Sequence, residues 1–181
     1  KPWTNWKRPG WLSSSRTLDW CFQSTDMSAA TTSVFGELDK WQAMLGRHEE
    51  LFTEMVPGSS VAIVPKEGSG IQPGKHVAGL MAAEGAGEML RWEVTTGGMR
   101  AERVPYRGFQ DAKVDLLFVA DEEALDKLRN NIGDETLSLM KRQIRAGNIM
   151  FFVMRTKYEL QDAGYEEFLD TLGLAFLGAC R

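Results

Sequence analysis

The longest hydrophobic pattern in the chain has a helical period and begins at residue 34. Apolar side chains recur at steps of three and four residues as far as Met55, which places them on one face of a helix. Pro57 and Gly58 follow, and both residue types are typical of a helix end. We therefore predict a long amphipathic helix in this segment. Its apolar face consists of Val34, Leu38, Trp41, Leu45, His48, Phe52 and Met55.

Short segments rich in branched and aromatic residues follow, and they predict a sheet of about five strands. Gly97-Gly98 separates two of them and is typical of a two-residue hairpin turn, so these two strands are expected to pair antiparallel. Residues 149–154 (IMFFVM) are apolar without interruption, which predicts an interior strand covered on both faces. A further, shorter candidate is residues 77–83. The main expected strands are residues 60–65, 89–96, 99–106, 114–119 and 149–154.

Capping signals divide the last third of the chain into helices. Asp121 and Asp134 each precede an apolar-periodic segment, where a carboxylate can accept from the free amide groups of a first helical turn. Gly147 is expected to end the second of these helices. Thr156 and Glu159 have the spacing of a capping box, which predicts the start of a last helix. The apolar face of that last helix would carry Tyr165, Phe168, Leu169, Leu172 and Phe176.

The order of these elements predicts an α+β fold. Strands are grouped in the middle of the chain and helices lie toward its ends, whereas an α/β fold would alternate them. We expect an about five-stranded, largely antiparallel sheet packed by a long N-terminal helix and a C-terminal helix. Residues 33–181 would form this single domain. Residues 1–32 would form an extended Trp-rich arm and spacer that precedes it.

The arm holds four of the six tryptophans of the chain without a helical or strand period. A segment of this kind cannot fold alone, so its aromatic rings must be buried against another part of the chain or against a partner. Because buried tryptophans are strong interface anchors, we predict that the arm binds a protein partner or a second copy of the chain. The predicted anchors are Trp3, Trp6, Trp11 and Trp20.

The charges are unevenly distributed along the chain. Residues 1–16 carry +4, which leaves −8 for residues 17–181. An acidic body argues against a nucleic-acid partner, because phosphate binding needs clustered Lys and Arg. No apolar run approaches the roughly 20 residues that span a bilayer. Cys21 and Cys180 are too few for a disulfide framework, and free thiols favour a reducing compartment. We expect a soluble, cytoplasmic protein.

No group of residues forms a catalytic or metal-binding motif. Residues 68–76 resemble a phosphate loop, but Ser69 replaces a required glycine and His76 stands where Ser or Thr is needed. The only two histidines, His48 and His76, lack metal-ligand spacing. We therefore expect no metal, no cofactor and no catalytic residue. The least implausible catalytic set assembled from distant positions is His48, His76 and Glu93.

One stretch resembles a known family. VDLLFVADEEALDKL, an amphipathic helix that runs into a glycine and an apolar strand (LMKRQIRAGNIMFFVM), and a last apolar helix together resemble the sterol carrier protein 2 (SCP2)-like family. With the preceding helix and hairpin, the resemblance covers about residues 33–177. It implies a non-catalytic domain that shelters a hydrophobic ligand between its sheet and its last helix. The chain departs from the family in its Trp-rich arm and at Thr156 and Lys157, where a second glycine is usual.

Two functions are compatible with these observations. In the first, the chain is an SCP2-like module that binds a lipid-like or other hydrophobic small molecule within a larger assembly. In the alternative, it is an accessory subunit of a protein complex, anchored by its arm and without a ligand of its own. The sequence does not distinguish a ligand tunnel from a filled core. The predicted apolar lining is Leu116, Phe118, Phe151, Met154, Phe168, Leu172 and Phe176.

Overall fold

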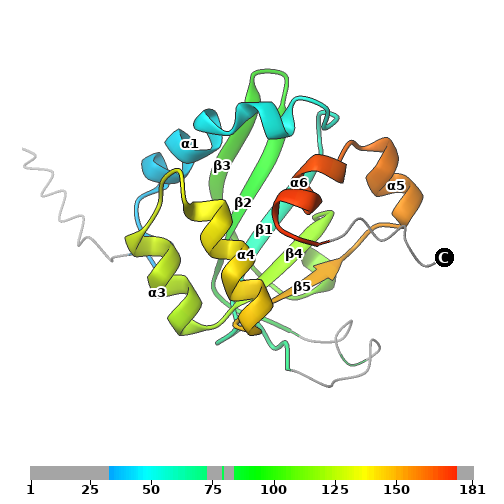
Figure 1. Cartoon of the computed structure of the whole chain (residues 1–181). Helices are drawn as coiled ribbons and strands as arrows, with labels where there is room; N and C mark the ends of the chain where they lie inside the picture. Colours follow the sequence, from blue (N-terminus) through cyan, green and yellow to red (C-terminus); the bar gives the residue numbers. More distant parts are fainter. Residues whose placement is uncertain (1–32, 73–78, 80–83, 175–181) are drawn as a thin grey trace, which may run out of the picture. The chain divides into compact units, whose positions relative to one another are not determined.

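The computed structural model describes residues 33–72, 79 and 84–174 (Figure 1). The strands in this part are β1 (Ser60–Pro65), β2 (Glu88–Thr95), β3 (Gly98–Pro105), β4 (Leu116–Ala120) and β5 (Ile149–Val153). The α-helices are α1 (Leu38–Arg47), α3 (Glu122–Asn130), α4 (Thr136–Ala146), α5 (Lys157–Asp162) and α6 (Glu166–Thr171). Two short 3-10 helices are η1 (Glu49–Phe52) and η2 (Gln110–Ala112).

The five strands form one sheet in the order β3-β2-β1-β4-β5. The pairs β2 with β3, β1 with β2 and β4 with β5 are antiparallel, and β1 runs parallel to β4. The predicted α+β class with a largely antiparallel sheet is therefore confirmed. Because β1 and β4 are parallel, both strands begin at one end of the sheet and both end at the other.

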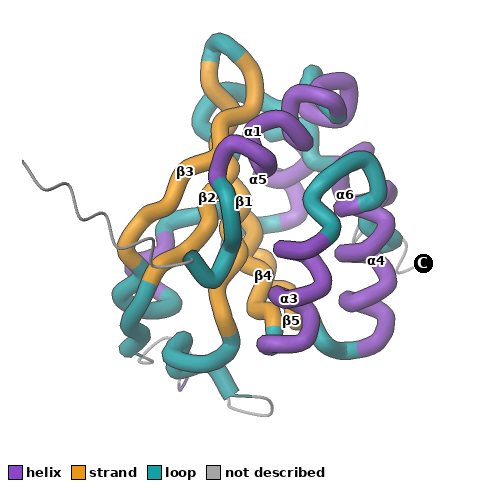
Figure 2. The backbone as a smooth tube through the Cα atoms, turned by 90° about the vertical axis from the view of Figure 1, so that its left-hand side faces the viewer, coloured by secondary structure: helices purple, strands orange, loops and turns teal. Residues whose placement is uncertain are grey.

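Alternating side chains divide the core between the two faces of the sheet. Leu116 and Phe118 of β4 join the larger apolar cluster, which includes buried residues of α1, α3, α4 and α6. Leu117 and Val119 point to the other face and join a smaller cluster with Tyr106 and residues of the loops around it. Figure 2 shows the same arrangement, with α3, α4 and α6 on one side of the strands. Helices thus cover one face, which we call the helical face.

The expected interior position of residues 149–154 is wrong. A strand does form over Ile149–Val153, but β5 lies at the edge of the sheet beside β4. Only Ile149 is fully buried, and the rest of the strand is half-buried. The apolar run is explained by its two faces, since Phe151 and Val153 pack on the helical-face cluster while Met150 and Phe152 pack on the other. An edge strand can therefore be apolar on both sides without being enclosed.

The long first helix is shorter than predicted. α1 ends at Arg47, and a turn of 3-10 helix follows after His48. Gly46 lowers the helix propensity of the last turn. The amide of His48 is shared between the carbonyls of Met44 and Leu45, the tighter geometry in which α-helices commonly end. The apolar face predicted for this helix continues beyond the α-helix, where Phe52 and Met55 are also buried.

The predicted last helix is two helices of six residues each. α5 starts at the predicted capping box, in which the amide of Glu159 donates to Thr156 and the carboxylate of Glu159 accepts from the amide of Thr156. The chain then bends at Gly164, whose φ of 75° lies in the left-handed region. α6 begins after Tyr165. Glycine at this bend separates the two helices because other residues adopt that conformation at a cost.

The other capping predictions have mixed outcomes. Asp121 caps α3 by accepting from the amide of Ala124, and Gly147 ends α4 with a φ of 82°, so both predictions are confirmed. Asp134 does not cap α4, because the helix starts later, at Thr136; its carboxylate pairs with Arg47 at 3.2 Å instead. The β2–β3 hairpin is confirmed, but its register pairs Thr95 with Gly98.

The two connecting residues of that hairpin are therefore 96 and 97, one position earlier than predicted. The candidate strand at residues 77–83 falls outside the described residues apart from position 79, so it stays a prediction.

Candidate functional site

The predicted lining residues lie mostly in the packed core. Four of them are fully buried in the helical-face cluster: Leu116, Phe118, Phe168 and Leu172. Phe151 is half-buried against the same cluster, whereas Met154 packs on the opposite face of the sheet. Phe176 falls outside the described residues, as do the four tryptophans of the arm. Of the predicted residues that the structure describes, none lines either cavity described below, so a tunnel at that place stays a prediction.

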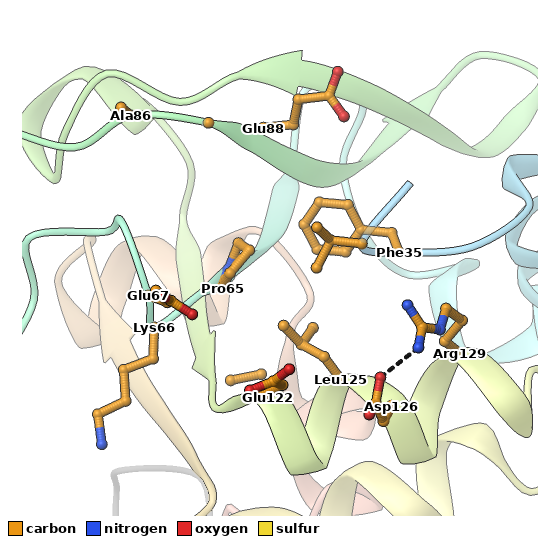
Figure 3. A pocket seen from close by; sticks show the side chains of 13 residues that line it. Phe35, Pro65, Lys66, Glu67, Ala86, Glu88, Glu122, Leu125, Asp126 and Arg129 are labelled. Carbon is orange, nitrogen blue, oxygen red and sulfur yellow. Dashed lines mark hydrogen bonds and ion pairs between the residues drawn. The ribbon is translucent and has the colours of Figure 1, made fainter. Parts of the chain in front are cut away.

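A cavity of about 530 Å³ lies where β1 and β4 end, and we call it the Phe35 cavity. Figure 3 shows its side chains, with Leu125 reaching from α3 toward Phe35 and Pro65. Phe35, Ala120 and Leu125 are buried members of the main core cluster, so the floor of the cavity is continuous with the core. The lining residues are Val34, Phe35, Pro65, Lys66, Glu67, Ala86, Gly87, Glu88, Ala120, Glu122, Leu125, Asp126 and Arg129.

Local structure holds Phe35 in this wall. The amide of Gly36 donates to the carbonyl of Ser33 at 2.8 Å and closes a turn around Phe35. The indole of Trp41 donates a buried hydrogen bond of 2.8 Å to the carbonyl of Phe35. Gly36 has a φ of 77°, and a Cβ there would lie 2.8 Å from Cγ of Arg129. Glycine thus permits both the turn and the close approach of α3.

The rim of the Phe35 cavity is charged. Arg129 pairs with Asp126 across one turn of α3 (Figure 3). Within the described residues, Glu67, Glu88 and Glu122 make no ion pair. The cavity therefore combines an apolar floor with a polar opening, which is the usual composition of a small-molecule site.

A second cavity of about 410 Å³ lies at the opposite end of the parallel strands, where β1 and β4 begin. We call it the Tyr165 cavity. The hydroxyl of Tyr165 donates to Oδ2 of Asp115 at 2.7 Å, and the amide of Ser60 donates to the same oxygen at 3.0 Å. Nε of Arg155 donates to the other oxygen, Oδ1, at 2.6 Å. The buried carboxylate of Asp115 is thus bound by three donors.

The chemistry of the Tyr165 cavity favours a structural role. Burial raises the pKa of Tyr165 well above its usual range, and the neighbouring Asp115 carboxylate raises it further. A phenol held neutral in this way is a poor nucleophile and a poor general base. Ser59, which is buried, also faces this cavity. The network ties β1, β4 and the start of α6 together.

The least implausible catalytic set does not come together in the described residues. His48 follows α1 on the helical face, and its Nε2 atom is buried without a hydrogen-bond partner there. Glu93 of β2 lies on the other face, where it pairs with Arg91 at 3.0 Å. His76 falls outside the described residues. In the part of the chain that is described, no cluster of three or more His, Cys, Asp or Glu side chains is placed to hold a metal.

Sequence reasoning missed both cavities. Asp115 offered a signal, since it is the lone charged residue in the apolar segment VDLLFV, and a buried carboxylate needs donors around it. The Phe35 cavity offered none, because its walls come from segments as far apart in the sequence as Val34 and Arg129. Among the described residues, no helix is both long enough and apolar enough to cross a membrane.

Comparisons with known proteins provide little support for a family. No family model matches the chain, and no curated protein matches it. One solved structure with some similarity is TT1886 from Thermus thermophilus, a conserved hypothetical protein described as a possible sterol carrier protein. It shares 14% sequence identity, and the match covers 80% of this chain and 91% of that one with a TM-score of 0.38. A TM-score of this size does not establish a common fold.

Proposed function

We propose that this chain is a non-catalytic module that binds a hydrophobic small molecule in the Phe35 cavity. The observation that carries the proposal is a cavity of about 530 Å³ with buried apolar residues as its floor. That volume lies within the range of about 300–1,000 Å³ that is typical of small-molecule sites. The Tyr165 cavity is less suitable for such a ligand, because charged and hydroxyl groups form much of its wall.

Two features of the Phe35 cavity support an apolar ligand. Phe35 and Leu125 face the cavity from different segments, and each is anchored in the main core cluster. The amide of Lys66 donates to the carbonyl of Ala120 at 2.7 Å, which ties together the two strand ends at the cavity wall. A wall held in place before binding reduces the entropy that binding must overcome.

The proposal agrees in part with the resemblance to the SCP2-like family, which also implies a hydrophobic ligand and no catalysis. It places the ligand elsewhere, however. The resemblance implies a site between the sheet and the last helix, where the described residues are tightly buried. Membership of the family and a place in a larger assembly stay proposals.

Fluorescence of the neutral probe N-phenylnaphthylamine tests the proposal, because its emission rises in an apolar environment. We expect saturable binding to the whole chain. The variant Ala86→Trp places a large side chain at an exposed position that lines the Phe35 cavity. It should weaken binding about ten-fold or more, since loss of about 1.4 kcal/mol corresponds to ten-fold in affinity.

The matched control is Val56→Trp, which places the same side chain at an exposed position of the Tyr165 cavity. It should leave probe binding unchanged. Circular dichroism and thermal unfolding would show that both variants are folded. Equal affinity of the two variants would reject the Phe35 cavity as the site.

A further inference from the structure

We propose that the Phe35 cavity selects cationic amphiphiles, in which an apolar chain carries an ammonium group. This inference rests on the proposed function and adds the chemical class of the ligand. The apolar floor formed by Phe35 and Leu125 would hold the chain. The acidic groups of the rim would bind the charged end.

The charges of the rim do not balance. Six ionisable residues line the cavity, and two of them, Asp126 and Arg129, neutralise each other as an ion pair. Of the other four, Glu67, Glu88 and Glu122 are acidic and Lys66 is basic. None of these four makes an ion pair or a side-chain hydrogen bond within the described residues. The rim therefore carries a net charge of −2 near neutral pH.

The three unpaired carboxylates come from different sides of the cavity. Glu67 follows the end of β1, Glu88 begins β2 and Glu122 begins α3. Charges distributed around an opening add their potentials at its centre, where the low-dielectric floor strengthens the field. Figure 3 shows the side chain of Lys66 extending away from Phe35 and Leu125. The carboxylate of Glu88 also points away from them, on the opposite side, so these two opposite charges both lie outside the apolar floor.

The start of α3 does not offset this preference. A helix N-terminus attracts anions through its free amide groups. Here Asp121 already caps α3, because its carboxylate accepts from the amide of Ala124 at 2.8 Å. Glu122 adds a negative charge to the first turn, whereas Glu123 pairs with Lys127 at 2.5 Å. An anionic ligand would meet these carboxylates without a free cation on the cavity floor to compensate.

Three compounds with the same chain and different head groups test the inference. Decylammonium, decanol and decanoate would each displace N-phenylnaphthylamine from the whole chain near neutral pH, below their critical micelle concentrations. We expect decylammonium to bind about ten-fold more tightly than decanoate, with decanol between them, because the carboxylates attract the ammonium group and repel the carboxylate. The preference should not be larger, because the acidic groups are exposed and partly screened. Added salt should reduce the difference between the charged compounds.

A charge-neutralised variant identifies the groups responsible. The triple substitution Glu67→Gln, Glu88→Gln and Glu122→Gln should reduce the preference for decylammonium over decanoate to nearly one. The matched control removes three exposed acidic groups that do not line the cavity, Glu50→Gln, Glu54→Gln and Glu166→Gln. It changes the net charge of the chain equally and should keep the preference.

The results separate the two proposals. If decanoate binds as tightly as decylammonium, or if the control variant loses the preference as well, the cation selectivity is wrong. The proposed function still stands in that case, provided that Ala86→Trp weakens probe binding. If Ala86→Trp has no effect on any of these compounds, the proposed site itself is wrong, and the inference about its ligand is rejected with it.

Discussion

The hydroxyl of Tyr165 donates a buried hydrogen bond of 2.7 Å to the carboxylate of Asp115, fifty positions earlier in the chain. Asp115 also accepts from the amide of Ser60 and from Arg155. Because a buried carboxylate is costly without donors, these contacts explain how a charged residue is accommodated at the start of a fully buried strand. The same contacts attach α6 to the sheet.

Removal of the Tyr165 hydroxyl should destabilise the protein. Tyr165→Phe leaves Asp115 with two of its three donors, so we expect a loss of about 1–3 kcal/mol in the free energy of unfolding. Urea unfolding followed by circular dichroism measures it. Tyr158→Phe is the control, since that side chain is 75% exposed and the change should be within about 0.5 kcal/mol. Equal stability of the two variants would contradict the role of the hydrogen bond.

The same tyrosine predicts a dependence of stability on alkaline pH. The folded protein raises the pKa of Tyr165 above the value of about 10 that an unfolded tyrosine has. The unfolded state therefore releases its proton first, and the stability contribution is present in full below about pH 10 and is lost as the pH rises above it.

Thermal unfolding across this pH range would check the alkaline prediction. Burial also raises the pKa of Tyr106, so some loss of stability remains when Tyr165 is replaced. The difference between the protein and Tyr165→Phe isolates the contribution of Tyr165. This difference in stability should shrink above about pH 10. A difference in stability that grows with pH would contradict the prediction.

The edge position of β5 predicts unequal effects of two paired phenylalanines. Phe118 of β4 and Phe151 of β5 are register partners. Phe118 is fully buried and Phe151 is half-buried. Phe118→Ala should cost about 3–5 kcal/mol, the usual range for a buried phenylalanine, and Phe151→Ala about half of that. Chemical denaturation of both variants measures the ratio, and equal costs would place β5 in the interior of the sheet after all.

The bend at Gly164 should not tolerate a side chain. Its φ is 75°, and a Cβ there would collide with the backbone carbonyl of Glu54. Gly164→Ala should therefore lower the stability by about 2 kcal/mol or more. Gly46→Ala is the matched control, because Gly46 lies in α1 with open space around it. That change should stabilise the protein by about 0.5–1 kcal/mol. Thermal unfolding midpoints would compare them.

Short-range signals in the sequence were read correctly in most cases. The capping box at Thr156, the cap at Asp121 and the stop at Gly147 depend on groups within a few residues of each other, and all three are present in the structure. Asp134 failed as a cap because α4 starts at Thr136, and its carboxylate pairs with Arg47 of another helix instead. The seven expected lining residues stay a prediction, since whether they enclose a space depends on packing and not on any local pattern.

The amino-acid sequence by itself determined the kinds of elements and their order, because hydrophobic period, turn residues and caps act locally. Only the tertiary structure decided that β5 lies at the edge, since apolar side chains on alternating faces look alike in an interior strand and in an edge strand that is half-covered. It also decided where space remains. The Phe35 cavity exists because a turn at Gly36, the end of β1 and the start of α3 pack together without filling the volume between them. No local sequence pattern predicts how such distant segments pack.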